Sequence, residues 1–201
     1  MGGKRKMNIS DFVGLKIINP ITSKNVPDVR SQWDQARKVR DLHQTLWTAD
    51  RSKSMPYTQL YYVPGLTTFC GIRGIPVLTG FMSGCYLFRY RDNGVLRAAH
   101  IGTHDTNKEA NDKAKAAWKA LVAQPHITDV FGYDPAKDVS MRLIQQAAKL
   151  GAPNIFGMWE GNGAVRVGII VRHQDNTWTL AGIEAAPLRP WSSIQNDAKM
   201  A

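Results

Sequence analysis

The feature that most constrains the fold is an Asn93-Gly94 dipeptide between two β-prone runs, Gly84–Arg91 and Val95–Ile101. Asn-Gly suits the two central positions of a type I′ turn, whose twist matches that of the flanking strands. The segment therefore predicts a β-hairpin in which Asp92 pairs with Val95.

This register decides which side chains share a face of the hairpin. With a two-residue loop, Cys85 lies opposite Gly102 and Leu87 lies opposite His100. Cys85 and His100 then stand diagonally on one face, roughly 7–8 Å apart at the backbone. A three-residue loop would place them on opposite faces, and a four-residue loop would restore them to one face. We expect the other face to be the core side and the Cys85 face to leave space for a ligand. The core-side residues are Tyr86, Phe88, Tyr90, Val95, Ala99 and Ile101.

Glycine and proline positions predict further short strands on both sides of the hairpin. These strands are Gln59–Val63, Thr67–Ile72, Val77–Phe81, Ile155–Trp159, Val165–Arg172 and Trp178–Glu184, with a turn at Asp175-Asn176 between the last two.

Three segments have helical patterns. Apolar residues at helical spacing predict a helix from Pro27 to just before Asp50. Thr106-Asn107-Lys108-Glu109 reads as a capping box, which opens a second helix that ends near Gln124-Pro125. The third helix is Pro135–Leu150, with Gly151 as its stop.

These segments predict a single α/β domain with a largely antiparallel or mixed sheet core, and a length of 201 residues suits one domain. We expect residues 1–26 to be irregular, residues 27–190 to form the domain, and residues 191–201 to be a loosely ordered tail.

Composition limits the classes of function. No uninterrupted apolar run approaches the roughly 20 residues of a membrane span, and no apolar segment of a signal peptide follows the basic Lys4–Lys6. Two cysteines are too few for a disulfide framework or a four-thiolate metal site. The net charge of +10 suits an anionic partner such as nucleic acid, but the basic residues are dispersed and favour an ordinary solvated surface.

Cys85 and His100 are the candidate nucleophile and base. A cysteine on a strand is usually a small buried hydrophobe, which is how we interpret Cys70. A thiolate beside an imidazole is instead a usable nucleophile at neutral pH. Gly84 can adopt a positive φ and let the backbone amides near Ser83–Cys85 converge as an oxyanion site.

A metal site is the alternative for the histidines. His100 and His104 have the spacing of a helical zinc motif, yet Gly102 and the β-type residues around it argue against a helix. We therefore expect neither a metal nor another cofactor.

The motif resembles a known group of enzymes. Met82-Ser83-Gly84-Cys85, with His100 fifteen residues after the cysteine, is similar to the hydrophobic-Ser-Gly-Cys signature of the cytotoxic necrotizing factor catalytic domains, with Met82 where leucine is usual. Thr79, six residues before Cys85, resembles the threonine that precedes the nucleophile in the Burkholderia lethal factor and in the chemotaxis receptor glutamine deamidases. The resemblance covers about 25 residues. It implies an α/β (α+β) fold with a central β-sandwich flanked by helices.

The resemblance also implies a Cys-His site with a third group that deamidates glutamine on a protein. We interpret residues 27–190 as a catalytic domain in which His100 activates Cys85 and Thr79 orients the imidazole. The partner would be a protein with an exposed glutamine, for example a small GTPase or a translation factor. We expect a monomeric toxin or effector, secreted without a cleaved signal peptide and acting in the cytoplasm of the target cell.

Other activities fit part of the pattern. The same thioester could react with an amine, which gives transglutamination, and a cysteine protease could use the same pair. A basic RNA-binding or ribonuclease toxin is supported mainly by the charge. A non-enzymatic adaptor or immunity protein is a further alternative.

Overall fold

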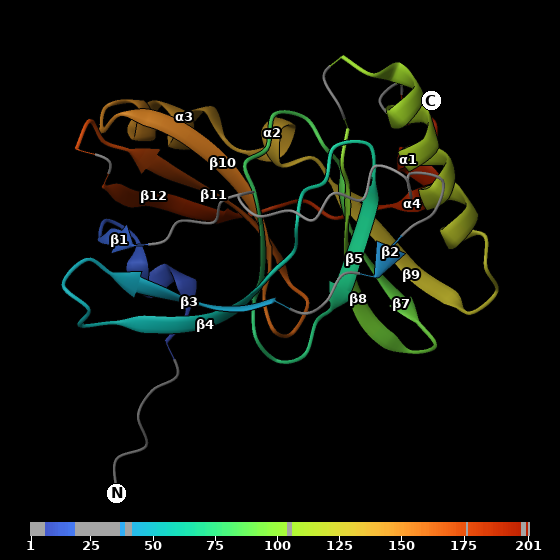
Figure 1. The fold of residues 1–201 in the computed structure, drawn as a ribbon, viewed down its shortest axis with the longest axis horizontal. Helices are drawn as coiled ribbons and strands as arrows, with labels where there is room; N and C mark the ends of the chain where they lie inside the picture. The colour runs from blue at the N-terminus through green and yellow to red at the C-terminus, as the bar shows by residue number, and fades with distance from the viewer. Residues whose placement is uncertain are drawn as a thin grey trace, which may run out of the picture.

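Two β-sheets dominate the computed structural model, which describes residues 7–18, 42–103, 106–175, 177–197 and 200, and the backbone of Arg37–Lys38. One sheet closes into a barrel and the other is a six-stranded open sheet (Figure 1). The predicted β-sandwich is therefore corrected, because one of the two sheets closes on itself.

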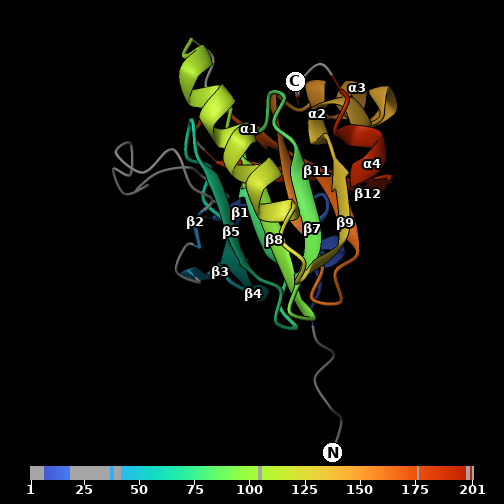
Figure 2. The ribbon, with the colours of Figure 1, turned by 90° about the vertical axis from the view of Figure 1, so that its right-hand side faces the viewer.

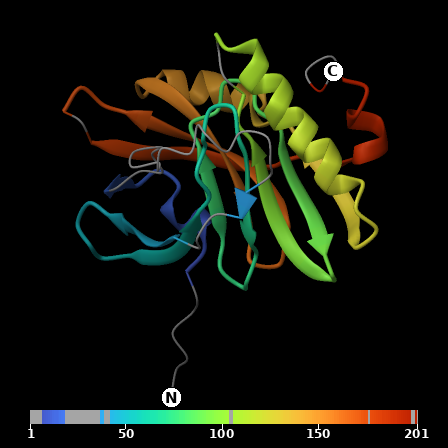
Figure 3. The same ribbon diagram turned by 45° about the vertical axis from the view of Figure 1, so that its right-hand side comes forward.

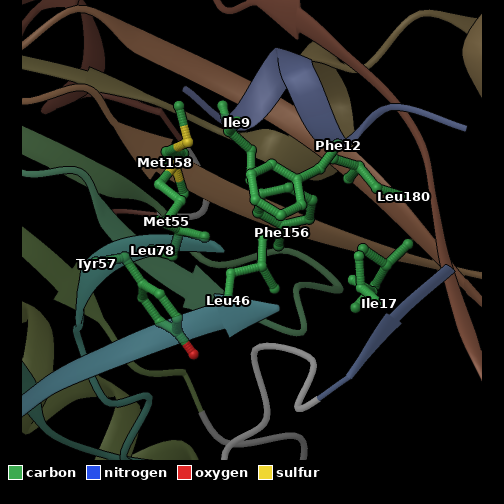
Figure 4. Close-up of a cluster of buried hydrophobic side chains, with 11 residues drawn as sticks. Ile9, Phe12, Ile17, Leu46, Met55, Tyr57, Leu78, Phe156, Met158 and Leu180 are labelled. Carbon is green, nitrogen blue, oxygen red and sulfur yellow. The ribbon is translucent and has the colours of Figure 1, made fainter. Parts of the chain in front are cut away.

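The barrel runs in the order β1-β12-β11-β10-β6-β4-β3 and closes where β1 pairs with β3. Its strands are β1 (Lys16–Ile18), β3 (Leu42–Thr48), β4 (Ser54–Gln59), β6 (Val77–Gly80), β10 (Ala152–Trp159), β11 (Val165–Arg172) and β12 (Trp178–Ala185). Apolar side chains fill its interior around Phe156, and the short 3-10 helix η1 (Ile9–Phe12) contributes Ile9 and Phe12 to this cluster (Figure 4).

The open sheet runs in the order β13-β9-β7-β8-β5-β2. Its strands are β2 (Arg37–Lys38), β5 (Thr67–Gly71), β7 (Leu87–Asp92), β8 (Val95–Ile101), β9 (Ile127–Tyr133) and β13 (Arg189–Pro190). The β7–β8 hairpin lies at its centre, and its register confirms the prediction: Asp92 pairs with Val95 and Leu87 pairs with His100.

Helices cover one face of this sheet. Helix α1 (Lys108–Val122) crosses the strands, and α4 (Trp191–Ile194) packs next to β9 and β13 (Figure 2). Trp118 of α1 is fully buried against Phe88 and Tyr90, the aromatic residues predicted for the core side. Two further helices, α2 (Pro135–Asp138) and α3 (Met141–Ala148), follow β9, and α3 packs on β10, β11 and β12 outside the barrel (Figure 3).

The other face of the sheet packs against the barrel. Cys85, Leu87 and Ala98 share a buried cluster with Val77 and Trp159 from the barrel strands. The expectation that only the α1 side is core is therefore wrong, because the sheet is buried on both faces.

The first predicted helix is also wrong where the structure describes it. Leu42–Thr48 is a strand that pairs with β4 from Leu42–Gln59 to Trp47–Ser54. Leu42 and Leu46 are four residues apart, a spacing that places them on one side of a helix and equally on one face of a strand. Backbone pairing with β4 stabilises the strand in preference to the helix. Residues 27–36 lie outside the described part of the chain.

Smaller differences concern the ends of elements. The α1 cap is Asn107, whose side chain accepts a hydrogen bond from the Ala110 amide, so the predicted Thr106 cap is shifted by one residue. The predicted helix 135–150 is two helices, since Val139 is extended and Ser140 caps α3. The predicted strand Gln59–Val63 is wrong except for Gln59, because β4 is Ser54–Gln59 and residues 60–63 are not in a strand.

The two predicted irregular ends are ordered where they are described. Lys16–Ile18 forms a barrel strand, within the segment 1–26 that we expected to be irregular. Trp191–Ile194 forms α4, within the expected loose tail. Both segments gain their order from tertiary contacts, which local sequence patterns do not report.

Candidate active site

Thr79 and His100 meet across the junction between the barrel and the open sheet. Thr79 lies on β6 and His100 on β8, and the Oγ1 atom of Thr79 is 2.8 Å from Nδ1 of His100. Both residues have no exposed surface. The Thr79 hydroxyl thus holds the Nδ1 edge of the imidazole, and this sets the direction in which Nε2 points.

The second ring nitrogen of His100 is available. Nε2 is buried and has no hydrogen-bond partner among the described residues. When Nδ1–H donates to the threonine oxygen, Nε2 carries the lone pair, which is the tautomer that a general base requires. Burial lowers the pKa of His100 from 6.5 to about 3, so the imidazole is neutral at neutral pH.

Cys85 lies just before β7, on the His100 face of the hairpin. Its neighbour Tyr86 accepts a hydrogen bond from the Ile101 amide, which extends the hairpin register beyond Leu87 and His100. Cys85 and Leu87 belong to the same buried cluster, whereas Tyr86 packs on the α1 side. The predicted sharing of one face is confirmed.

Within the described part of the chain Nε2 of His100 has no hydrogen-bond partner, so it makes no direct hydrogen bond to Cys85. The Sγ atom of Cys85 instead lies 3.2 Å from Oγ1 of Thr103. Catalytic hydrogen bonds are often long in the absence of substrate and tighten when it binds. Cys85 is 5% exposed and therefore buried in this layer.

Tyr62 links the two halves of the site. Its ring centroid lies 5.2 Å from that of His100, at 33° to the imidazole plane. Its hydroxyl donates a 2.6 Å hydrogen bond to the carbonyl oxygen of Thr103. One half-buried side chain therefore contacts the candidate base and the residue beside the thiol.

The segment after Tyr62 holds the end of β8. The Gly65 amide donates to the Gly102 carbonyl at 2.6 Å, and the Gly102 amide donates to the Leu66 carbonyl at 3.0 Å. A Cβ atom on Gly102 would lie 2.1 Å from the Val63 carbonyl oxygen. Only glycine allows this approach of two backbones, which fixes Thr103 relative to His100.

The predicted oxyanion segment lies beside the thiol. Ser83 is exposed and Gly84 is half-buried, so the approach to Cys85 passes along this segment. Gly84 is not among the described glycines with a positive φ, of which Gly74 and Gly94 are nearest in sequence. The backbone conformation that we expected of Gly84 is therefore not the one adopted here.

Tyr62 and Thr103 were missed from the sequence. The hairpin register already places Gly102 opposite Cys85, so Thr103, the next residue, could have been identified from it. Tyr62 carries no comparable signal, because its partner Thr103 is 41 residues away.

Other residues do not assemble a second site of this kind. The described residues contain no group of three or more His, Cys, Asp or Glu side chains suited to a metal ion. His104, the rival base, lies outside them. Cys70 is fully buried in the same cluster as Cys85, and both thiols are free of disulfides. No helix in the described ranges is long and apolar enough to cross a bilayer.

Comparisons with known proteins give a low similarity. No protein-family model and no curated protein matches the sequence. Among solved structures, the chain is similar to the C-terminal domain of CNFy from Yersinia pseudotuberculosis, with a TM-score of 0.28 and 13% sequence identity. The match covers 71% of this chain and 64% of that domain, so the chain spans less than two thirds of its length. At this level of similarity the function has to be inferred from the geometry of the site.

Proposed function

We propose that this chain is a cysteine-dependent hydrolase of side-chain amides, specifically a protein glutamine deamidase. The observation that supports it best is the 2.8 Å contact between Thr79 and His100, which leaves Nε2 of the imidazole free on the face that carries Cys85. A nucleophile, a base and a group that orients the base are the three parts that such chemistry needs.

The reaction begins from a neutral thiol and a neutral imidazole. Nε2 of His100 takes the proton from Cys85 as the sulfur attacks the carboxamide carbon of glutamine, and a C–S bond forms. The tetrahedral intermediate then expels ammonia, which receives the proton from Nε2. Backbone amides near Ser83 and Cys85 would stabilise the oxyanion.

Water completes the reaction. It attacks the thioester carbon while Nε2 accepts one of its protons, the C–S bond breaks, and that proton returns to the sulfur of Cys85. The target is left with glutamate in place of glutamine. Thr79 keeps the same imidazole edge engaged throughout, so the base does not have to reorient between the steps.

Limited access favours a side-chain amide over a peptide bond as substrate. Cys85 is only 5% exposed, and a terminal carboxamide on a long side chain is slender enough to approach it. Cys85 also precedes a strand, whereas papain-like proteases set their cysteine at a helix N-terminus. An exposed glutamine on a small GTPase or a translation factor is a substrate of this kind, which suits a toxin or secreted effector.

The test is a comparison of wild-type protein and Cys85→Ala mixed with host-cell lysate. We expect glutamine-to-glutamate conversion on a defined target protein with the wild type and none with Cys85→Ala, measured by mass spectrometry of tryptic peptides. Cys70→Ala is the matched control, because it removes the other thiol of the same cluster.

Three outcomes would change the proposal. Full conversion by Cys85→Ala would exclude the thiol mechanism. Amine-adducted glutamines would assign transglutamination instead of hydrolysis. Salt-sensitive RNA binding that survives Cys85→Ala, without any converted glutamine, would favour the RNA-binding alternative.

A further inference from the structure

We propose that Thr103 and Tyr62 complete this site: the Thr103 hydroxyl donates a hydrogen bond to the Cys85 thiolate, and Tyr62 holds Thr103 and His100 in place. The inference rests on the proposed function and adds to it a catalytic residue that touches the reacting sulfur and a positioning residue that acts through its neighbours.

The Thr103 hydroxyl is well placed for this role. Oγ1 lies 3.2 Å from Sγ of Cys85, within hydrogen-bond distance for sulfur. A hydroxyl can rotate to donate when the sulfur is charged. A hydrogen bond to the charged form lowers the pKa of the group that accepts it, which offsets the effect of burial on the thiol.

The position of Thr103 is fixed by its own backbone. Its carbonyl oxygen accepts the 2.6 Å hydrogen bond from the Tyr62 hydroxyl. The preceding Gly102 is held at both its amide and its carbonyl by Leu66 and Gly65. The hydroxyl is therefore presented to the sulfur from a constrained segment, which is the requirement for electrostatic stabilisation without reorganisation.

Tyr62 couples Thr103 to the base. Its ring lies against the imidazole of His100 while its hydroxyl binds Thr103, so the face of the imidazole and the Thr103 backbone are positioned by one side chain. Thr79 controls the Nδ1 edge of the same ring. The hydrogen bond from Thr79 restricts rotation of the imidazole within its plane, and the Tyr62 ring restricts movement of the imidazole perpendicular to that plane.

Titratable side chains pack in the same cluster as the thiol. Among the described residues, the buried cluster of Cys85 contains Cys70 and Tyr133, with Tyr62 packed against it and His100 on the neighbouring strand. Burial keeps the pKa of Tyr133 well above 10, so this tyrosine is neutral in the range where a thiol titrates.

The probe is iodoacetamide, whose rate of reaction with Cys85 is followed by mass spectrometry across a range of pH. Thr103→Val removes the hydroxyl at nearly constant shape. We expect it to raise the pKa of Cys85 and slow alkylation about tenfold near neutral pH, with the rate returning toward the wild-type value at alkaline pH, where the thiolate forms regardless. Thr103→Ser restores the hydroxyl and should recover most of the rate.

Tyr62 is tested in two steps. Tyr62→Phe keeps the ring and loses the bond to Thr103, so we expect part of the Thr103→Val effect, about threefold near neutral pH. Tyr62→Leu loses both contacts and should slow the reaction further. Tyr61→Phe is the matched control on the adjacent, also half-buried tyrosine, and should leave the rate unchanged.

The outcomes separate this inference from the proposed function. If wild-type Cys85 reacts no faster than Cys85 in a His100→Asn variant, the thiol is not activated and the proposed function fails. If His100→Asn slows the reaction but Thr103→Val matches the wild type at every pH, only the present inference is overturned. Thermal unfolding of each variant shows that it is folded, and recovery with Thr103→Ser shows that the hydroxyl is responsible.

Discussion

His100 has no exposed surface, and its burial lowers its pKa from 6.5 to about 3. The folded state therefore keeps the ring neutral over a range in which the unfolded chain binds a proton. Stability falls as the pH drops from 6.5 toward about 3, because protons bind preferentially to the unfolded state. Above 6.5 the ring is neutral in both states and contributes no pH dependence.

This linkage makes the free energy of unfolding depend on pH to a measurable extent. Each pKa unit corresponds to about 1.4 kcal/mol, so the full shift would remove about 5 kcal/mol of stability between the two pKa values. We expect the stability advantage of the wild type over His100→Gln in urea unfolding to narrow steadily from about pH 6.5 to about pH 5.5, a window above the range in which most carboxylates titrate. Curves that fall in parallel would contradict the buried neutral ring.

The two cysteines, Cys85 and Cys70, show that residue type alone does not identify a candidate nucleophile. Both are buried thiols of one cluster on the His100 face of the open sheet, but Cys70 lies within β5, whereas Cys85 lies just before β7 with its sulfur 3.2 Å from the Thr103 hydroxyl. The difference lies in the neighbours, since burial and residue type are the same for the two.

At the scale of elements, α4 shows that a short helix gains its order from packing. Trp191 lies edge-on to Phe88 at 5.7 Å and to Trp118 at 6.2 Å between ring centroids. A helix of four residues has almost no intrinsic stability in water, so these contacts hold it in place. The sequence after Pro190 reads as a tail because its aromatic partners lie far away along the chain.

Removal of the Trp191 ring should therefore destabilise the whole fold. We expect Trp191→Ala to lower the free energy of unfolding by about 2 kcal/mol, less than for a fully buried tryptophan because Trp191 is half-buried. Chemical denaturation followed by circular dichroism measures this change. Ser192→Ala, at an exposed position of the same helix, should have an effect within about 0.5 kcal/mol. Equal stabilities of the two variants would mean that α4 is not docked.

At the scale of the whole molecule, buried polar side chains join the barrel to the open sheet. One such contact is the Thr79–His100 hydrogen bond of the site. Another is made by Tyr133 of β9, whose hydroxyl donates to the Met158 carbonyl at 3.2 Å and accepts from the Met158 amide at 3.0 Å on β10. The candidate site therefore lies in an interface between sheets, and its geometry depends on their relative position.

Tyr133→Phe tests this connection. The variant leaves the Met158 amide without its acceptor in a buried layer, so we expect a loss of about 1–3 kcal/mol in the free energy of unfolding. Tyr90→Phe is the matched control, because the Tyr90 hydroxyl is also buried but has no hydrogen-bond partner among the described residues. That control should be neutral or stabilising. Equal losses for the two variants would show that the Tyr133 hydroxyl does not join the sheets.

The sequence by itself determined the local features. Asn93-Gly94 and the alternation around it set the hairpin register, and that register placed Cys85 and His100 on one face. Most strands of the second half of the chain were predicted close to their observed bounds, because turn residues and alternation are local signals. Thr79 was singled out through a resemblance, because it lies six residues before Cys85 as a threonine does in the related deamidase motifs.

Tertiary structure decided the rest. Closure of the barrel depends on β1 meeting both β3 and β12, and Leu42–Thr48 is a strand because β4 lies beside it. The second face of the hairpin is buried because the barrel packs on it. Tyr62 meets His100 and Thr103 only once the chain has folded. Hydrogen bonds and apolar burial between distant segments override the local preference for helix or strand. Such contacts cannot be recognised from residues that are close together in the sequence.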